Sequence, residues 1–199
     1  FIYSGAKAPA LSGISFKAMP GQTIGVIGGT GSGKTTLVNL IPRFYDADKG
    51  QVLVDGVDVR DYTLDGLRSK IGVVPQRPVL FKGTLRDNMK WGKKDASDEE
   101  IYDALNMAQA REFVNDKGQG LMLHIDQGGR NLSGGQRQRL TIARALVRRP
   151  EILIMDDSAS ALDFATDARL RKAIRKGTED MTVFIVSQRA TTIKQADLI

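Results

Sequence analysis

Cysteine is absent from all 199 residues, so the chain has no disulfide and no thiolate metal ligand. Its absence also mildly favours a reducing compartment. No apolar run approaches the ~18–20 residues that cross a bilayer, which predicts a soluble segment. A signal peptide is lacking too, because Phe1-Ile2-Tyr3 has the character of the middle of a strand. Residues 196–199 also stop within an apolar run, so we expect the chain to be a piece of a larger protein.

Acidic residues are fewer than basic ones, and the formal net charge is +6. A surplus of this sign can indicate nucleic acid or an anionic membrane surface as a partner. Here the bases are scattered, and no basic stripe alternates with the few aromatic residues. We therefore expect no nucleic-acid partner.

Short apolar runs alternate with segments of helical spacing, which is typical of an α/β fold with a mainly parallel sheet. The Asp55-Gly56 turn predicts an antiparallel β portion in the N-terminal part. From Thr84 to about Arg149 the sequence is mostly helical. We expect one domain, residues 1–199, with a core formed by 1–82 and 150–199 and an inserted helical lobe at about 83–149. The expected strands are 23–28, 51–54, 57–59, 71–74, 152–155 and 182–186, and the expected helices are 34–41, 137–149, 166–176 and one that Ser97 opens and that extends to Phe113.

A glycine-rich stretch joins the strand expected at 23–28 to the helix expected at 34–41. It fits the pattern G-x-x-x-x-G-K-[ST], which requires this strand–loop–helix context. Glycines let backbone N–H groups curl around phosphate oxygens, Lys34 supplies charge to the outer phosphates, and the Thr35 hydroxyl can bind Mg²⁺. A plain glycine-rich turn does not explain a lysine at a helix start, where it opposes the helix dipole unless an anion is bound. The predicted nucleotide-binding residues are Gly28, Gly29, Thr30, Gly31, Ser32, Gly33, Lys34, Thr35 and Thr36.

Two aspartates, Asp156 and Asp157, end the buried strand expected at 152–155. Open α/β sheets place their ligands at the carboxyl ends of strands. Asp156 therefore fits the role of holding Mg²⁺ through a coordinated water. The simpler alternative is a carboxylate that caps a helix or a turn.

The segment Leu132-Ser133-Gly134-Gly135-Gln136 opens the longest helix of the expected lobe. Ser133 stands where an N-cap belongs, and Gln136 follows three residues later, which is a capping box. The first turn then presents unpaired N–H groups and a positive dipole end to an anion. Gly134 and Gly135 also let another surface approach closely. Alone, the segment would be an ordinary capped helix.

With the phosphate loop, Leu132–Gln136 and the acidic strand in this order, essentially the whole chain resembles the nucleotide-binding domain of ABC transporters. The resemblance implies a P-loop NTPase core, with ATP and Mg²⁺ as cofactors. It also implies a head-to-tail dimer, in which each ATP lies between the phosphate loop of one domain and the signature of a second ABC domain. In this chain Leu132–Gln136 is the signature.

Further residues take family roles by the same resemblance. Gln76 matches the Q-loop glutamine, which contacts Mg²⁺ and water at the hinge to the lobe. Tyr3 matches the aromatic residue that stacks on adenine. The residues similar to the D-loop, which crosses the dimer interface, are Ser160, Ala161, Leu162 and Asp163.

Two stretches resemble the exporter branch of the family. Val79–Asn88 is similar to the exporter segment after the Q-loop, and Ile125–Gly129 is similar to the loop that couples to the membrane domain. Exporters carry six membrane helices N-terminal to this domain on the same chain. The resemblance thus implies a transmembrane domain as partner and a location at the cytoplasmic face of the cell membrane.

Two catalytic positions depart from the family pattern. Asp157 stands where the family has a glutamate that polarises the attacking water, and Gln188 replaces the switch histidine. The only histidine, His124, precedes the signature, and we expect it to be a solvated loop residue. Both departures affect hydrolysis rather than binding. The resemblance therefore implies the degenerate half of a heterodimeric exporter, whose partner carries Glu and His.

Other classes stay open on the sequence. An Asp with a Gln could still support normal hydrolysis in a homodimeric exporter. A soluble ABC ATPase of chromosomes or ribosomes would carry a long coiled coil or a tandem repeat, and neither is visible. A P-loop GTPase would carry an Asn-Lys-x-Asp motif, which is absent, and neither a GTPase nor a small-molecule kinase explains the signature.

Overall fold

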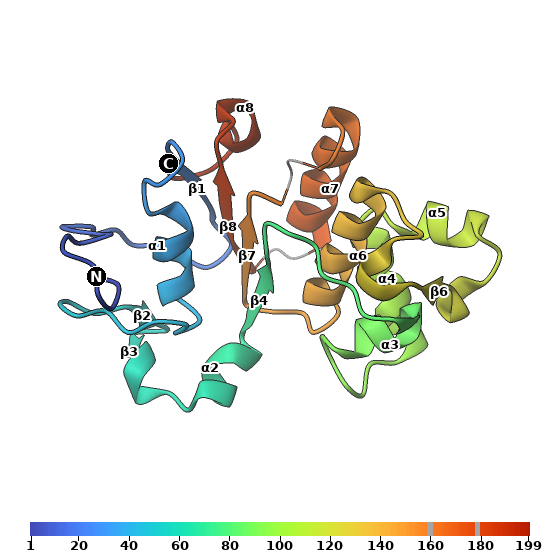
Figure 1. Ribbon diagram of the computed structural model, residues 1–199, viewed down its shortest axis with the longest axis horizontal. Helices are drawn as coiled ribbons and strands as arrows, with labels where there is room; N and C mark the ends of the chain where they lie inside the picture. Colours follow the sequence, from blue (N-terminus) through green and yellow to red (C-terminus); the bar gives the residue numbers. More distant parts are fainter. Residues whose placement is uncertain (159–160, 178–179) are drawn as a thin grey trace.

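A parallel sheet forms the centre of the molecule (Figure 1). The computed structural model describes residues 1–158, 161–177 and 180–199. The four strands lie in the order β1-β8-β7-β4, and all three pairings are parallel. The register places the carboxyl ends of β1, β8 and β7 at one edge, since Ile27 pairs with Ser187 and Asp156 with Val186. The strands are β1 Thr23–Ile27, β4 Ile71–Val74, β7 Ile152–Asp156 and β8 Thr182–Ser187.

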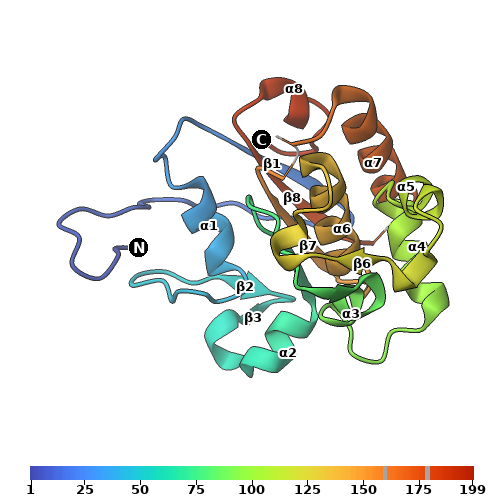
Figure 2. The ribbon, with the colours of Figure 1, turned by 45° about the vertical axis from the view of Figure 1, so that its right-hand side comes forward.

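Helices cover both faces of this sheet, as Figures 1 and 2 show. α1 and α2 lie on one side, and α3 to α7 lie on the other. Side chains alternate along a strand, so Leu153 and Met155 of β7 pack in one hydrophobic cluster while Ile154 packs in the other. The helices are α1 Lys34–Leu40, α2 Leu64–Ser69, α3 Leu85–Lys90, α4 Asp98–Met107, α5 Arg111–Asp116, α6 Gly134–Leu146, α7 Phe164–Gly177 and α8 Ala190–Ile193, with 3-10 turns at Val59–Asp61, Gly120–Met122 and Gln127–Gly129.

These elements confirm the predicted α/β class, the mainly parallel sheet and the helical lobe. The expected antiparallel portion is a short hairpin, β2 Leu53–Val54 with β3 Val57–Asp58. A second short pair, β5 Gly83–Thr84 with β6 His124–Ile125, joins the start of the lobe to the segment before the signature. All helices from α3 to α6 fall within residues 83–149. The boundaries of core and lobe stay a prediction.

Three local expectations were wrong. Phe1–Tyr3 is not in a strand, and the described residues 1–22 contain none. The helix that Ser97 caps ends at Met107, because Gln109 adopts a left-handed φ of 57° and Phe113 then falls in α5. His124 is exposed as expected, but it lies in β6 rather than in a loop.

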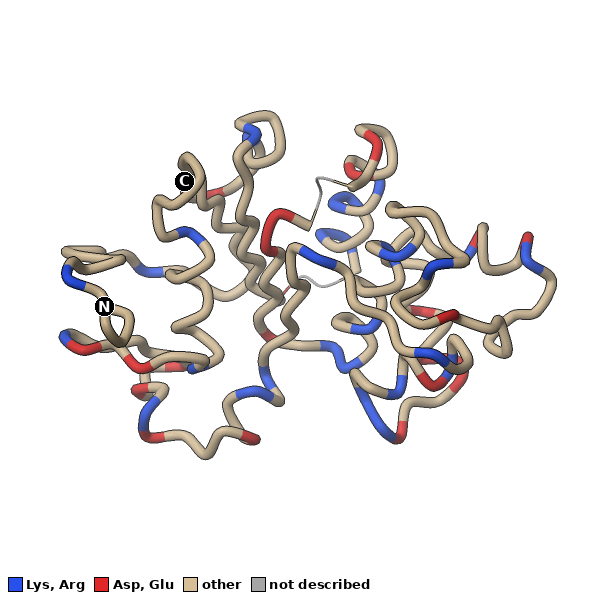
Figure 3. Tube along the Cα trace, in the orientation of Figure 1, with Lys and Arg blue, Asp and Glu red and all other residues tan. Residues whose placement is uncertain are grey.

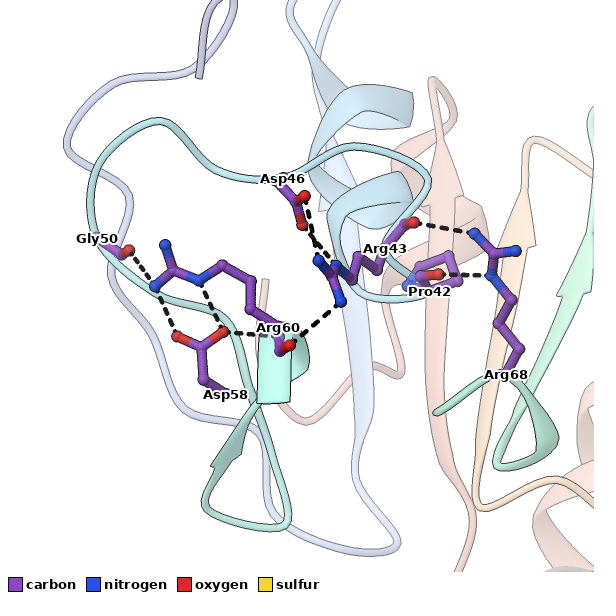
Figure 4. Close-up of polar contacts among 7 residues, drawn as sticks. All are labelled: Pro42, Arg43, Asp46, Gly50, Asp58, Arg60 and Arg68. Carbon is purple, nitrogen blue, oxygen red and sulfur yellow. Dashed lines mark hydrogen bonds and ion pairs between the residues drawn. The ribbon is translucent and has the colours of Figure 1, made fainter. Parts of the chain in front are cut away.

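Three arginines connect the hairpin region to the end of α1 (Figure 4). Arg68 of α2 donates to the backbone oxygens of Pro42 (3.1 Å) and Arg43 (3.0 Å). The Arg43 side chain donates to the oxygen of Arg60 at 3.2 Å, and Arg60 forms an ion pair with Asp58 at 2.7 Å. This network holds the loop after α1 in place, and thereby the helix that begins with Lys34.

Substituting Gly92 by alanine should strongly destabilise the lobe. A Cβ at this position would lie against the backbone oxygen of Arg144 and only 2.8 Å from the Val147 side chain, so α6 would have to shift. Overpacking of this kind typically costs ~1–3 kcal/mol or more. Urea denaturation followed by circular dichroism measures the loss.

Gly118→Ala is the matched control. A Cβ there would meet no atom within 4 Å, but the residue has a φ of 69°. Only the backbone penalty applies, which is about 1–2 kcal/mol for a residue other than glycine in this region. Gly92→Ala losing less stability than Gly118→Ala would contradict the close approach.

The Asp58–Arg60 pair predicts a pH dependence of stability. Hydrogen bonds from Arg60 lower the pKa of Asp58 from 3.8 to about 2. Because the folded-state pKa lies below the unfolded value, the ionised carboxylate stabilises the fold above 3.8, and this contribution is lost as the pH falls through about 2.

Asp58→Asn keeps an oxygen for the N–H of Arg60 but removes the charge. We expect the wild type to be more stable than this variant at pH 6, and the difference to disappear in that acid range. Thermal unfolding at a series of pH values measures the difference, and a gap that is constant with pH would contradict the assignment.

Candidate functional site

The glycine-rich loop between β1 and α1 has the backbone that its sequence predicts. Gly31 and Gly33 adopt left-handed φ values of 81° and 85°, which other residues adopt only with strain. A Cβ on Gly28 would lie 2.5 Å from the Ser32 hydroxyl, so the loop closes tightly on itself. Lys34 Nζ donates to the backbone oxygen of Gly29 at 2.6 Å, across the loop opening. This position makes the ammonium group of Lys34 available to phosphate oxygens.

Thr35 and Asp156 bring the loop and the end of β7 together. The Thr35 hydroxyl lies 2.9 Å from Oδ2 and 3.2 Å from Oδ1 of Asp156. Burial raises the pKa of Asp156, and the neighbouring Asp157 raises it further, while Thr35 and Lys34 act in the opposite direction. A carboxylate in this position is stabilised by a nearby cation.

The oxygen donors fit Mg²⁺. This ion binds one or two protein oxygens and takes its other ligands from phosphates and water. Thr35 and Asp156 supply a hydroxyl and a carboxylate next to each other. The described residues contain no group of three His, Cys, Asp or Glu side chains that could hold a metal alone. The donor set is therefore that of a cation shared with a phosphate ligand.

Asp157 and Gln76 also meet at this edge of the sheet. Gln76 Nε2 lies 3.3 Å from Oδ2 of Asp157, which connects the end of β4 to the end of β7. The backbone of Asp157 is left-handed, with a φ of 44°, and its N–H donates to the oxygen of Val186 at 3.0 Å. The turn after β7 thus aims the carboxylate of Asp157 toward the Q-loop position.

Gln188 completes the group from the end of β8. Its Nε2 lies 3.5 Å from the Thr30 hydroxyl, at the limit of a hydrogen bond. The predicted residues Thr30, Thr35, Gln76, Asp156, Asp157 and Gln188 are therefore brought together by the carboxyl ends of four strands.

Tyr3 lies beside α1. Its hydroxyl is 2.8 Å from that of Thr36, which is 6% exposed. The ring meets Phe1 and Tyr45 edge-on, at centroid distances of 4.8 and 5.2 Å. The structure thus places the predicted adenine-stacking residue in an aromatic group at the phosphate-loop helix, and the stacking itself stays a prediction.

The signature has the capping box that its sequence predicts. Ser133 Oγ accepts from the N–H of Gln136 at 3.2 Å, and Gln136 Oε1 accepts from the N–H of Ser133 at 3.0 Å. Leu132 is buried in the lobe core. Among the described residues, no hydrogen bond or ion pair joins the signature to the phosphate loop.

The D-loop follows β7 and lies against the signature helix. Ser160 lies outside the described residues. A Cβ on Gly135 would be 3.2 Å from the oxygen of Ala161, and Leu162 is buried. Asp163 Oδ1 accepts from the N–H of Thr166 at the start of α7, and hydrogen bonds from Thr166 lower the pKa of Asp163.

The two exporter-like stretches are neighbours in space. β5 of the first pairs with β6 of the second, and the N–H of Gly128 donates to the oxygen of Leu80 at 3.1 Å. Arg137 of α6 donates to the oxygens of Leu132 (2.9 Å) and Gly129 (3.4 Å). Contacts thus lead from the segment after Gln76 to the signature helix.

Two groups at this site were missed by the sequence analysis. Tyr45 packs on Tyr3, and nothing in its local sequence indicates this. Gln138 is fully buried on α6, although it is polar. The sequence does indicate this burial, because Gln138, Thr141, Ile142 and Ala145 have the i, i+3, i+4, i+7 spacing of a buried helix face.

The parallel sheet, the glycine-rich loop and the acidic end of β7 define a protein with the P-loop NTPase fold. The chain belongs to the ABC transporter family, whose model matches residues 11–160.

Similar proteins span the whole chain. An uncharacterized ABC transporter ATP-binding protein of Mycobacterium bovis is 48% identical and covers 100% of this chain, and the match is 34% of that protein. A beta-(1-->2)glucan export ATP-binding/permease protein of Nitrobacter winogradskyi is 45% identical over 96% of this chain and 31% of its own length. The structure of a bacterial Atm1-family ABC exporter with ATP bound has a TM-score of 0.92, with 34% identity over 98% of this chain and 35% of that chain.

The chain thus spans about a third of the length of the curated relatives that it matches. None of the helices in the described part of the chain has the length and apolar character needed to cross a membrane.

Proposed function

We propose that this chain is the ATP-binding domain of an ABC exporter, which binds MgATP and pairs head-to-tail with a second ABC domain. One observation carries the proposal: four strand ends gather a phosphate-binding and cation-binding site, while the capped signature makes no described bond to it. The signature of the second ABC domain would supply further N–H donors to the phosphates. The proposed location is the cytoplasmic face of the cell membrane, with a transmembrane domain on the same full-length protein.

Each residue of the site has a proposed role in binding. The backbone N–H groups of the loop and Lys34 hold the phosphates, as in other P-loop sites. Thr35 and Asp156 hold Mg²⁺, Asp156 through a water, and Gln76 contacts the ion and the attacking water. Tyr3 stacks on adenine. MgATP supplies the bond that is broken, and these side chains orient it and neutralise its charge.

Hydrolysis at this chain's own phosphate loop is proposed to be slow. Asp157 is one methylene shorter than the family glutamate, which withdraws its carboxylate by ~1 Å, and a misplacement of that size can cost ~10²-fold in rate. The Gln76 amide also binds this carboxylate, at 3.3 Å. Gln188 reaches the loop and can donate a hydrogen bond to a γ-phosphate, but it cannot carry the charge of a protonated imidazole.

The signature, by contrast, is intact and correctly capped. This combination supports a heterodimer, in which Leu132–Gln136 completes the site of a partner with Glu and His at the two catalytic positions. Ala161, Leu162 and Asp163 would cross the interface. A homodimer would place Asp157 and Gln188 in both sites and leave no fast site.

The exporter assignment rests on the stretches Val79–Asn88 and Ile125–Gly129, which pair in the structure. Relatives whose names describe export, a glucan exporter and an Atm1-family exporter, cover nearly the whole chain. The transported substrate follows from the membrane domain and not from this one.

Restoring the family residues should accelerate hydrolysis. We expect Asp157→Glu combined with Gln188→His to raise the rate of ATP turnover by ~10²-fold, since it restores the longer carboxylate and the imidazole. The affinity for MgATP should change little, because a histidine at position 188 can donate a hydrogen bond to the γ-phosphate as Gln188 can, and Asp157 is not assigned to binding. Phosphate release measures turnover, and nucleotide titration measures affinity. If the wild type already hydrolyses ATP as fast as the double variant, the slow-site proposal is wrong.

Two variants of Tyr3 distinguish a stacking role from a hydrogen-bonding role. Tyr3→Phe loses the bond to Thr36 but keeps an aromatic face, whereas Tyr3→Ala loses both. If Tyr3 stacks on adenine, Tyr3→Phe retains the wild-type ATP affinity and Tyr3→Ala loses ~1–3 kcal/mol of binding free energy. Titration with ATP and with inorganic triphosphate provides the control, because triphosphate binding should be equal in all three proteins. Equal weakening for both ligands would show that Tyr3 only supports α1.

A further inference from the structure

Tyr3, the residue proposed to stack on adenine, lies in a segment without regular secondary structure. Residues 1–22 form no helix and no strand. The segment passes directly against the phosphate loop, because a Cβ on Gly33 would lie 2.8 Å from the backbone oxygen of Ala10. Since no helix or strand orders the Tyr3 side chain, its orientation depends on contacts with other parts of the chain.

The loop after α1 supplies two of these contacts. The rings of Tyr45 and Tyr3 meet edge-on, with a centroid distance of 5.2 Å and an angle of 87° between their planes. Asp48 Oδ2 accepts from the backbone N–H of Ile2 at 2.7 Å. On α1 itself, the Thr36 hydroxyl contacts that of Tyr3 at 2.8 Å. Tyr45 is thus the contact of this loop that acts on the ring of Tyr3 rather than on its backbone or its hydroxyl.

The loop that carries Tyr45 is itself well held, as Figure 4 shows. Arg43 forms an ion pair with Asp46 at 2.7 Å, one residue beyond Tyr45. Arg68 of α2 donates to the backbone oxygen of Arg43 at 3.0 Å. Tyr45 therefore lies between residues that are tied to α2 and to each other, which makes it a firm support for a neighbouring side chain.

The geometry of the aromatic group leaves a face of Tyr3 open to a ligand. The three ring centroids form a triangle of nearly equal sides, with Tyr3 4.8 Å from Phe1 and 5.2 Å from Tyr45, and with Phe1 5.5 Å from Tyr45. In such a triangle Phe1 and Tyr45 lie on one side of Tyr3, so they cannot cover its two opposite faces. Neither ring therefore covers at least one face of Tyr3, and Tyr3 is only partly buried.

We propose that Tyr45 is a positioning residue for nucleotide binding. Its ring holds the ring of Tyr3 in the orientation that presents the open face to adenine, and Tyr45 does not touch the base. The inference rests on the proposed function, because it requires Tyr3 to stack on adenine. A ring held in this way before the ligand arrives increases affinity, because less freedom is lost on binding.

The first test compares two substitutions of Tyr45 in the full 199-residue chain. Tyr45→Leu keeps an apolar side chain but removes the ring, and the strength of edge-on aromatic pairs predicts a loss of ~2–10-fold in ATP affinity. Its affinity for inorganic triphosphate should equal that of the wild type, which also shows that the phosphate loop is intact. Tyr45→Phe keeps the ring and should bind both ligands as the wild type does. Calorimetric titration with each ligand in the presence of Mg²⁺ measures the affinities.

A double-mutant cycle with Tyr3→Ala tests whether Tyr45 acts through Tyr3. If it does, removing the ring of Tyr45 has no further effect once the ring of Tyr3 is gone. The combination of Tyr3→Ala and Tyr45→Leu should therefore bind ATP as weakly as Tyr3→Ala alone, and no weaker. A general supporting role of Tyr45 in the fold would not make its effect on ATP depend on Tyr3.

Phe44→Leu is the matched control, because it makes a similar change at the neighbouring position. Phe44 is 47% exposed and Tyr45 is 43% exposed, so the two rings are similarly accessible. The ring of Phe44, however, lies 5.3 Å from the guanidinium carbon of Arg68, on which it packs. Phe44→Leu should leave the ratio of ATP affinity to triphosphate affinity as in the wild type.

Three results would overturn this inference and leave the stacking of Tyr3 standing. Wild-type ATP affinity in Tyr45→Leu would show that Tyr3 needs no such support. Fold-losses of Tyr45→Leu and Tyr3→Ala that multiply in the double variant would show that Tyr45 contacts adenine itself. An equal loss for ATP and triphosphate would show that Tyr45 only supports the fold. If instead Tyr3→Ala binds ATP as tightly as the wild type, the proposed role of Tyr3 fails, and the inference fails with it.

Discussion

The hydrogen bond from Thr35 to Asp156 is the contact on which the arrangement of the site depends, because it joins the phosphate-loop helix to a central strand. β7 is paired on both sides and buried on both faces, so its end is a rigid point. From that point the chain turns at Asp157 toward Gln76. Burial raises the pKa of Asp156, and a bound cation would stabilise its ionised form. The fold thus holds a carboxylate where Mg²⁺ and phosphates are required.

The two ends of the nucleotide site, the phosphate loop and the end of β7, differ in their contacts with α6, the helix that begins with the signature. Its first turn, capped by Ser133 and Gln136, has no described bond to the phosphate loop. The same turn, however, lies close to the segment after β7, since a Cβ on Gly135 would be 3.2 Å from the oxygen of Ala161. In the proposed dimer, this helix presents its N-terminus to the nucleotide site of a second ABC domain. Figure 3 shows Lys and Arg distributed over both sides of the trace, with no single basic stripe.

Sequence alone predicted the parts of this site that rest on local chemistry. Helical spacing and the capping box located α6, and the strand–glycine–lysine order located the phosphate loop, because these signals lie within a few residues. The resemblance to a family added Gln76 and Gln188, which no local pattern marks. Neither source predicted the left-handed turn at Asp157. Aspartate is enriched in this region, but only a few per cent of residues other than glycine adopt it, so the local sequence does not locate the turn. The burial of Gln138 was also missed, although Gln138, Thr141, Ile142 and Ala145 have the spacing of a buried helix face.

The most direct test of the account uses the absence of cysteine. We propose that the phosphate loop of this chain faces the signature of a second ABC domain, with MgATP between them. In a sample that holds this chain alone, a second copy takes the place of the partner, because it carries the same phosphate loop and signature. Thr30→Cys in one sample of the chain and Ser133→Cys in another, mixed and treated with a short bis-maleimide, reports this contact. The account predicts a cross-linked dimer of twice the chain mass that forms with MgATP and not without it. A cross-link that is equally strong without nucleotide, or none when MgATP binding is measured in the same sample, would contradict it.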